Sequence, residues 1–297
     1  MGTPDYASEI LSALVNDNDI NVVAVYTQPD KPVGRKKVMT PPITKVVALE
    51  NNLPVYQPTR LRNEDTVAEL LEIECDYIVV AAYGQILPKT VLDHAPCINL
   101  HASILPAYRG ASPIQQAILN GDKETGVTAM MMDVGLDTGD IIKIDKITIG
   151  KEEMVSTLFD RLTVCATALT LDVLKNFTTY SAVPQDESQF THCTKITKQE
   201  GLVSFDDAIS LYNRYRAFTP WPGVYLESGL KIKKMSLVEI EKVHKAGEII
   251  AVEKEQIIVG CQKGSVAIEL VQPASKKEMS VIAYLNGKRL SLADTLA

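Results

Sequence analysis

The sequence predicts an α/β domain built on a parallel sheet, followed by a smaller β domain. Through the first half of the chain, apolar β-branched runs alternate with helical patterns. Parallel strands joined by crossover helices produce this alternation. From residue 203 onward, short β-rich runs are separated by turns, which is typical of a small β-barrel. We therefore expect domains at residues 1–186 and 203–297, joined by a linker at 187–202.

The elements of the first domain follow from the spacing of apolar residues, since a period near 3.6 favours helix and β-branched runs favour strand. The expected helices are 7–15, 43–51, 63–71, 113–119 and 152–176. The expected strands are 20–27, 55–57, 76–82, 97–100 and 126–132. Residues 28–42, with several prolines and lysines, are expected to form a loop, and 178–196 show few apolar pairs.

The second domain is expected to contain strands at 224–227, 230–233, 247–252, 257–261 and 266–271. Trp221, the only tryptophan, stands between two prolines. We expect its side chain to anchor the packing of this domain, because large aromatic side chains bury much apolar surface; the alternative is that it stacks on a nucleic-acid base.

Charge and cysteine content limit the classes of function. The net charge of -7 argues against a general nucleic-acid binder. The charge is uneven, however: residues 198–297 hold 14 basic and 12 acidic residues (+2), and residues 1–197 hold 16 and 25 (-9). A slightly basic tail hints at a polyanionic partner. The five scattered cysteines show no metal spacing and suggest reduced thiols.

Targeting signals are not evident in the sequence. No apolar run reaches the length of a membrane span, and no signal-peptide pattern precedes the first helix. We expect a cytoplasmic monomer with no membrane contact.

Three polar residues stand where two of the expected strands end. Asn99 and His101 close one strand, and Asp137 lies in a loop after the next, between Gly135 and Gly139. In open α/β sheets, ligands bind at the carboxyl ends of the strands. Each of these residues alone is common in purely structural positions, but together they indicate a reactive site.

These three residues suit the transfer of an acyl group to an amine. Asn99 and His101 can donate hydrogen bonds to the negative charge that develops on the acyl oxygen. Asp137 can relay the proton that the amine loses, and can orient His101. No serine or cysteine nucleophile is needed, because the amine attacks directly.

The segment from Asn99 to Gly110, with its Tyr108-Arg109-Gly110 end, resembles the motif of the folate-dependent formyltransferase family. The Asp137 loop matches as well, and Ile104 stands where the family usually has leucine. The resemblance runs along the whole chain, through Gly2 to Asp5, Thr27 to Asp30, Ala82 to Gly84, Lys195 to Lys198 and Arg216 to Pro222.

The resemblance implies a Rossmann-like formyltransferase domain and a C-terminal OB-like barrel that helps to hold tRNA. It implies 10-formyltetrahydrofolate as carrier, no metal, and the amino group of initiator methionyl-tRNA as acceptor. It implies Asn99, His101 and Asp137 as the catalytic set. Folate contact is implied for Ser103, Ile104, Leu105 and Pro106, with the pterin side lined by Tyr83, Gly84, Ile86 and Leu87.

A cationic loop supports the tRNA branch of the family. Arg35, Lys36 and Lys37 follow an expected strand, where a ligand end would approach. Cations there can pair with backbone phosphates, and the resemblance implies contact with the acceptor stem. If the acceptor were glycinamide ribonucleotide or an amino-sugar nucleotide, this loop would have no role in binding it. A non-catalytic RNA-binding protein is a further alternative, disfavoured by the intact Asn99, His101 and Asp137.

The family has a β-strand before the Gly-Thr-Pro turn, whereas here Met1 directly precedes Gly2. We therefore expect the centre of the sheet to lack a strand in the chain as given, since the first strand of such sheets is central.

Overall fold

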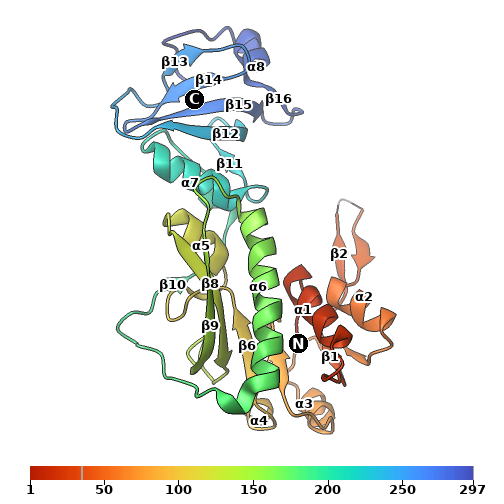
Figure 1. Cartoon of the computed structure of the whole chain (residues 1–297). Helices are drawn as coiled ribbons and strands as arrows, with labels where there is room; N and C mark the ends of the chain where they lie inside the picture. Colours follow the sequence, from red (N-terminus) through yellow and green to blue (C-terminus); the bar gives the residue numbers. More distant parts are fainter. Residues whose placement is uncertain (35, 297) are drawn as a thin grey trace. The chain divides into compact units, whose positions relative to one another are not determined.

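The computed structural model describes residues 1–34 and 36–296. They form two compact units (Figure 1). Unit 1 comprises Met1–Pro113, Glu124–Thr148 and Thr157–Cys193, and unit 2 comprises Ile114–Lys123, Ile149–Ser156 and Thr194–Ala297. Among the described residues, no helix is both long and apolar enough to cross a membrane.

The first part of the sheet in unit 1 is parallel, as predicted. Strand β1 (Val25–Tyr26) pairs with β4 (Val55–Tyr56), and β5 (Ile78–Val80) pairs with β6 (Cys97–His101). The first two residues lie between these pairs: the Gly2 amide donates to Tyr26 O, and the Ala81 amide donates to Met1 O, both at 2.9 Å.

The second part of the sheet is antiparallel, so the sheet is mixed and not parallel throughout. Strand β8 (Glu124–Met131) runs antiparallel to β6, and β9 (Ile141–Thr148) runs antiparallel to β8. The short 132–140 connection explains the β8–β9 pair, because a parallel neighbour would need a longer crossover. Strand β9 was not predicted, since its charged residues give it a half-exposed, weakly apolar pattern.

Except for the four-residue α4, which was not predicted, the helices of the first half agree with the predicted periodicity. They are α1 (Asp5–Asn16), α2 (Ile43–Glu50), α3 (Glu64–Leu71), α4 (Lys89–Leu92), α5 (Pro113–Leu119) and α6 (Val155–Asn176), which continues into the short 3-10 helix Phe177–Thr179. The expected loop 28–42 instead contains an exposed hairpin of β2 (Lys31–Val33) and β3 (Val38–Thr40), which projects in Figure 1.

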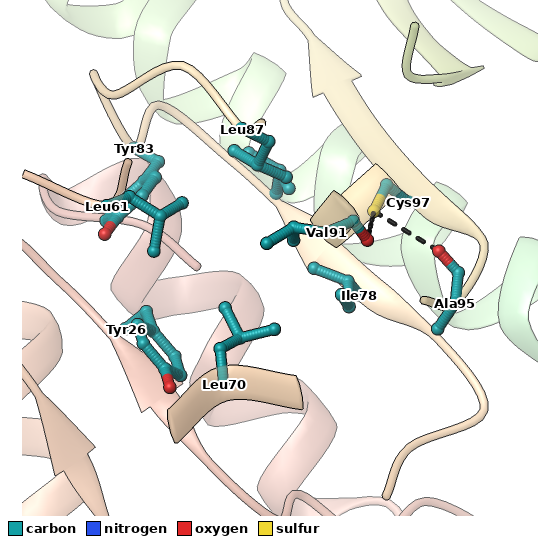
Figure 2. Packing of buried hydrophobic residues seen from close by; sticks show 10 residues of the cluster. Tyr26, Leu61, Leu70, Ile78, Tyr83, Leu87, Val91, Ala95 and Cys97 are labelled. Carbon is teal, nitrogen blue, oxygen red and sulfur yellow. Dashed lines mark hydrogen bonds between the residues drawn. The ribbon is translucent and has the colours of Figure 1, made fainter. Parts of the chain in front are cut away.

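A buried apolar cluster in unit 1 fixes the ends of the parallel strands. Figure 2 shows Tyr26 of β1, Ile78 of β5 and Tyr83, just after β5, among the side chains of this cluster. The Cys97 thiol donates to Ala95 O at 3.3 Å, and burial raises the pKa of this thiol to about 12. Cys97 is therefore a packing residue, not a reactive nucleophile.

A cavity of about 700 Å³ lies beside Met1, between the chain leading into β1 and the chain leading into β5. Residues 19–25 and 74–77 line it, together with apolar side chains of α1. The expected strand 20–27 is regular only at Val25–Tyr26. Residues 20–24 have no ladder partner among the described residues, which explains why their β-branched sequence does not produce a regular strand.

Unit 2 is built on an antiparallel sheet in the order β11 (Val224–Tyr225), β12 (Lys231–Glu239), β15 (Ser265–Gln272), β14 (Ile257–Gly260) and β13 (Ile249–Val252). Strand β16 (Met279–Ser280) also pairs with β15. Within the described part of the chain no ladder joins β11 to β13, so the sheet is open and the OB-like barrel is not confirmed.

Several further elements, in both units, were not predicted. They are β7 (Arg109–Gly110) and β10 (His192–Cys193) of unit 1, and the 3-10 helix Lys198–Gly201, α7 (Ala208–Phe218) and α8 (Val281–Lys288) of unit 2. The prediction for Trp221 was wrong, since its side chain is 59% exposed. The buried ring of Phe218, at the end of α7, fills the anchoring role instead.

The cavity beside Met1 predicts a gain in stability when it is filled. Six apolar β-branched residues fused ahead of Met1 could pair with the chain on both sides. Each buried valine or isoleucine contributes about 1.5–3 kcal/mol, against about 1–2 kcal/mol for ordering each residue's backbone. We expect a net rise of roughly a few kcal/mol in the free energy of unfolding, measured by thermal and urea denaturation. A glycine-serine hexapeptide at the same position is the control, and equal stability of the two fusions would contradict this interpretation.

Candidate active site

The end of β6 presents Asn99 and His101 on one side of the strand, because residues two apart point the same way. Asn99 lies opposite Val80 of β5 and Met130 of β8 in the sheet. The loop between β8 and β9 brings Asp137 to the same place. Asn99 Nδ2 donates to Asp137 Oδ1 at 3.3 Å, and His101 Nδ1 lies 3.6 Å from Asp137 Oδ2. Of the three residues singled out from the sequence, Asp137 therefore contacts both of the others.

The His101 ring is 7% exposed, and its orientation follows from its neighbours. Its Nε2 atom lies 2.9 Å from the carbonyl oxygen of Tyr108. Because a carbonyl can only accept, Nε2 carries the hydrogen. Nδ1 is consequently the ring nitrogen that faces Asp137, and a second ring proton would lie between these two groups.

Asp137 adopts a positive φ of 54°, which is uncommon for a residue with a side chain. Its carboxylate is 13% exposed. The backbone amide of Gly110 donates to Oδ2 at 2.9 Å. The carboxylate is thus held by β6 on one side and by the Tyr108-Arg109-Gly110 segment on another.

The loop after β6 is tied to β8 by one threonine. Thr128 Oγ1 donates to Ser103 O at 2.6 Å and accepts from the Leu105 amide at 3.1 Å. The Ser103 hydroxyl donates to Ala107 O. Ser103 and Leu105 are buried, whereas Ile104 and Pro106 are half-buried. Of the loop residues expected to contact folate, Ile104 and Pro106 are therefore the ones whose side chains a ligand can reach.

The expected pterin-lining residues also divide into two kinds. Tyr83 and Leu87 are buried in the apolar cluster of Figure 2, where burial raises the pKa of Tyr83 to about 12. Gly84 and Ile86 are exposed. They line a second cavity, of about 790 Å³, together with Gln28, Thr59, Arg60, Leu61, Arg62, Asn63 and Gln85.

This second cavity lies at the carboxyl ends of three parallel strands and carries positive charge. The residues that line it come from the segments that follow β1, β4 and β5, and they include Arg60 and Arg62 but no carboxylate. Gly84 has a φ of +77°, a conformation that favours glycine. A crevice at this edge of the sheet is where α/β proteins bind ligands, and its charge favours an anion.

Known families match both halves of the chain. A model described as formyl transferase matches residues 1–174, and a model described as formyl transferase, C-terminal domain, matches residues 195–289. The chain belongs to the formyl transferase family. The resemblance inferred from the Asn99 to Gly110 segment is thereby confirmed.

Relatives in this family match over the full chain. The methionyl-tRNA formyltransferase of Sulfurimonas denitrificans is 61% identical over 100% of this chain and 98% of its own length. That of a Nitratiruptor species is 52% identical over 99% of this chain and 98% of its own length. A solved N-formyltransferase from Helicobacter canadensis, in complex with folinic acid and dTDP-3-aminofucose, has a TM-score of 0.70. It is 19% identical and covers 91% of this chain and 97% of the solved chain, so it shows the fold alone.

The sequence analysis assigned no role to two residues of this formyl transferase site, Arg109 and Gln185. Arg109 lies in the family motif, but no contact or role was predicted for its side chain, which is only 3% exposed. Gln185 lies among residues 178–196, where few apolar pairs occur. Residues up to Cys193 nevertheless belong to unit 1, and β10 pairs in parallel with β7. Gln185 accepts from Arg109 and donates to the Asp137 loop.

Two of the cations expected to contact tRNA are placed by the structure. Lys36 and Lys37 are exposed in the turn of the β2–β3 hairpin, and the Lys37 amide donates to Gly34 O. Arg35 lies outside the described residues. The same hairpin exposes the apolar side chains of Val33, Val38 and Met39.

Metal ligation finds no support in the described part of the chain. No group of three or more histidine, cysteine, aspartate or glutamate side chains there is close enough to hold an ion.

Proposed function

We propose that the chain transfers the formyl group of 10-formyltetrahydrofolate to the amino group of initiator methionyl-tRNA, as a cytoplasmic monomer that supports translation initiation. The observation that carries this proposal is the contact of Asn99 and His101 with Asp137 at the end of β6. The tRNA acceptor is supported by the full-length identity of 61% with a relative that bears that name.

The roles of the three residues follow from the bonds that change. The amine nitrogen bonds to the formyl carbon, and the bond from that carbon to the carrier nitrogen breaks. One proton leaves the amine and one reaches the carrier nitrogen. Asp137, the carboxylate of the site, is suited to take the first proton and return it. Asn99 Nδ2 retains a second hydrogen that can stabilise negative charge on the formyl oxygen, and His101 can add to this only when its ring carries a second proton on Nδ1.

The carrier fits the cavity that begins at Gly84 and Ile86. A volume of about 790 Å³ is within the ordinary range for ligand pockets. Folates end in glutamate carboxylates, and Arg60 and Arg62 are cations suited to meet them. Ile104 and Pro106 supply apolar contacts, while Ser103, Leu105, Tyr83 and Leu87 act through their backbone or as support. The carrier brings the activated formyl group, so the transfer needs no metal.

The tRNA is proposed to contact Lys36 and Lys37 in the hairpin turn, Arg35, which precedes them in the sequence, and the more basic C-terminal part of the chain. Residues 198–297 carry a net charge of +2 from 14 basic and 12 acidic residues. In this proposal residues 1–186 form the catalytic domain and 203–297 the tRNA-binding domain. Attraction by these cations opposes the repulsion between the acidic first domain and a polyanion.

A formyl-transfer assay with separate acceptors tests the proposal. The full chain is given 10-formyltetrahydrofolate with initiator methionyl-tRNA, with glycinamide ribonucleotide, or with an amino-sugar nucleotide. We expect formylation of the tRNA alone. Transfer to either small amine without transfer to the tRNA would replace the acceptor, and no transfer to any of them would reject the reaction.

The variants His101→Ala and Asp137→Asn are expected to lose most turnover while remaining folded. Loss of one oxyanion donor typically costs about 2.7–4 kcal/mol of transition-state stabilisation, or about 100- to 1,000-fold in kcat. The measurements are kcat for methionyl-tRNA and the thermal melting temperature. Asp140→Asn is the matched control, because Asp140 is an exposed carboxylate three residues along the same loop. Near-normal turnover of His101→Ala and Asp137→Asn would reject the catalytic set.

The variant Arg35→Ala is expected to weaken the use of tRNA but not of folate. Loss of one phosphate contact should flatten the dependence of log Kd on log salt concentration by about one unit. Binding of tRNA is measured between low and moderate salt, with KM for folate measured in parallel. Lys89→Ala, which removes an exposed cation from α4, is the control. An altered folate KM with unchanged tRNA binding would assign the loop to the carrier site instead.

A further inference from the structure

The side chain of Gln185 joins Arg109 to the turn that carries Asp137. It is 9% exposed. Its Nε2 atom donates to the carbonyl oxygens of Asp137 at 2.9 Å and of Gly139 at 2.8 Å. Both hydrogens of the amide are therefore used on the turn that carries the Asp137 carboxylate. Because these acceptors lie at Asp137 itself and two residues beyond it, the bonds fix the backbone of this turn.

Arg109 determines which way the Gln185 amide faces. Arg109 Nε and Nη2 donate to Gln185 Oε1 at 3.0 and 2.8 Å. A guanidinium has only donors, so the amide oxygen must face it and the NH₂ group must face the Asp137 turn. Arg109 is in turn held by Glu187, which accepts from Nη1 at 3.1 Å and from Nη2 at 2.7 Å. The Glu187 carboxyl has a lowered pKa because of this bond to Arg109.

The turn needs such support because of its backbone conformation. Asp137 has a φ of +54°, and a residue with a Cβ keeps this conformation only when its surroundings hold it there. The direction of the side chain depends on the backbone that carries it. If the carbonyls of Asp137 and Gly139 lost their donor, the carboxylate could turn away from Asn99 and His101. Its present contacts, at 3.3 and 3.6 Å, leave little tolerance for such a shift.

We propose that Gln185, oriented by Arg109, is a positioning residue for formyl transfer, which holds the Asp137 turn so that its carboxylate faces Asn99 and His101. This inference rests on the proposed catalytic role of Asp137. Gln185 itself acts only through the backbone of the turn. The segment that carries it, up to β10, thereby serves the active site as well as connecting the chain.

The variant Gln185→Glu tests the inference most sharply. A carboxylate still accepts from Arg109 but donates nothing to the two carbonyls. We expect kcat to fall by at least about 10-fold, since misplacement of a reacting group by 1 Å can cost about 100-fold. KM for the carrier and for methionyl-tRNA should stay within about twofold. Gln189→Glu, the same change at an exposed position of the same segment, should leave kcat unchanged.

A double-mutant cycle separates positioning from an independent role. In an Asp137→Asn background, Gln185→Glu should have little further effect, because coupled residues lose their contribution together. An equal fold-loss of kcat in both backgrounds, or an unchanged kcat of Gln185→Glu, would overturn the inference. If Gln185→Glu melts at a much lower temperature, Gln185→Met, of similar volume, is measured in the same cycle and must give the same result.

The cycle also distinguishes this inference from the proposed function. A severe loss of kcat in Asp137→Asn together with a normal kcat in Gln185→Glu would reject the positioning role alone. Near-normal turnover of Asp137→Asn would instead reject the proposed catalytic set, whatever Gln185→Glu does.

Discussion

The carboxylate of Asp137 accepts hydrogen bonds from the Asn99 side chain and the Gly110 amide, and lies against the His101 ring. A carboxylate that is mostly removed from water needs such partners, because burying it unpaired would cost several kcal/mol. Three separate segments must therefore lie together: the end of β6, the Tyr108-Arg109-Gly110 segment, and the loop between β8 and β9. Much of the packing in unit 1 positions these segments around the carboxylate.

The packing of the sheet fixes the positions of these segments. Strand β6 lies between β5 and β8, so its last residues are fixed from both sides. Thr128 of β8 ties the loop after β6 through Ser103 O and the Leu105 amide. The apolar cluster of Figure 2 anchors β5 and the chain after it, where Tyr83 is buried and Gly84 is exposed. The same few residues thus connect the buried core to the surface where a ligand can bind.

The site and the parallel strands were predictable because their signals are local. Cys97 to His101 is an apolar run that ends in polar residues, and the Asp137 loop lies between glycines, so both features stand out in the sequence. The helices α1 and α6 were predictable from their regular apolar spacing. The catalytic roles remain a prediction from the motif, supported by the contacts among the three side chains.

Other features depend on partners distant in the sequence. Residues 20–24 include the β-branched Ile20, Val22 and Val23, but a strand needs a ladder partner, and none lies beside them in the described chain. Strand β9 is half-exposed and charged, so its pairing with β8 decides its structure more than its own composition does. Gln185 lies in a polar segment without periodicity, and only its bonds to Arg109 and the Asp137 turn reveal its position in the site.

The protonation of His101 tests the central claim most directly, because the account depends on which ring nitrogen faces Asp137. The chain has four histidines, so ¹⁵N-histidine labelling and long-range ¹⁵N–¹H NMR spectra can resolve each ring. The contact with Tyr108 O predicts a hydrogen on Nε2 of His101, both in the wild type and in Asp137→Asn. The contact with Asp137 predicts that the variant changes mainly the Nδ1 signal. A ring protonated on Nδ1 alone, or an Nδ1 signal that is the same in the wild type and in Asp137→Asn, would contradict the arrangement described for this site.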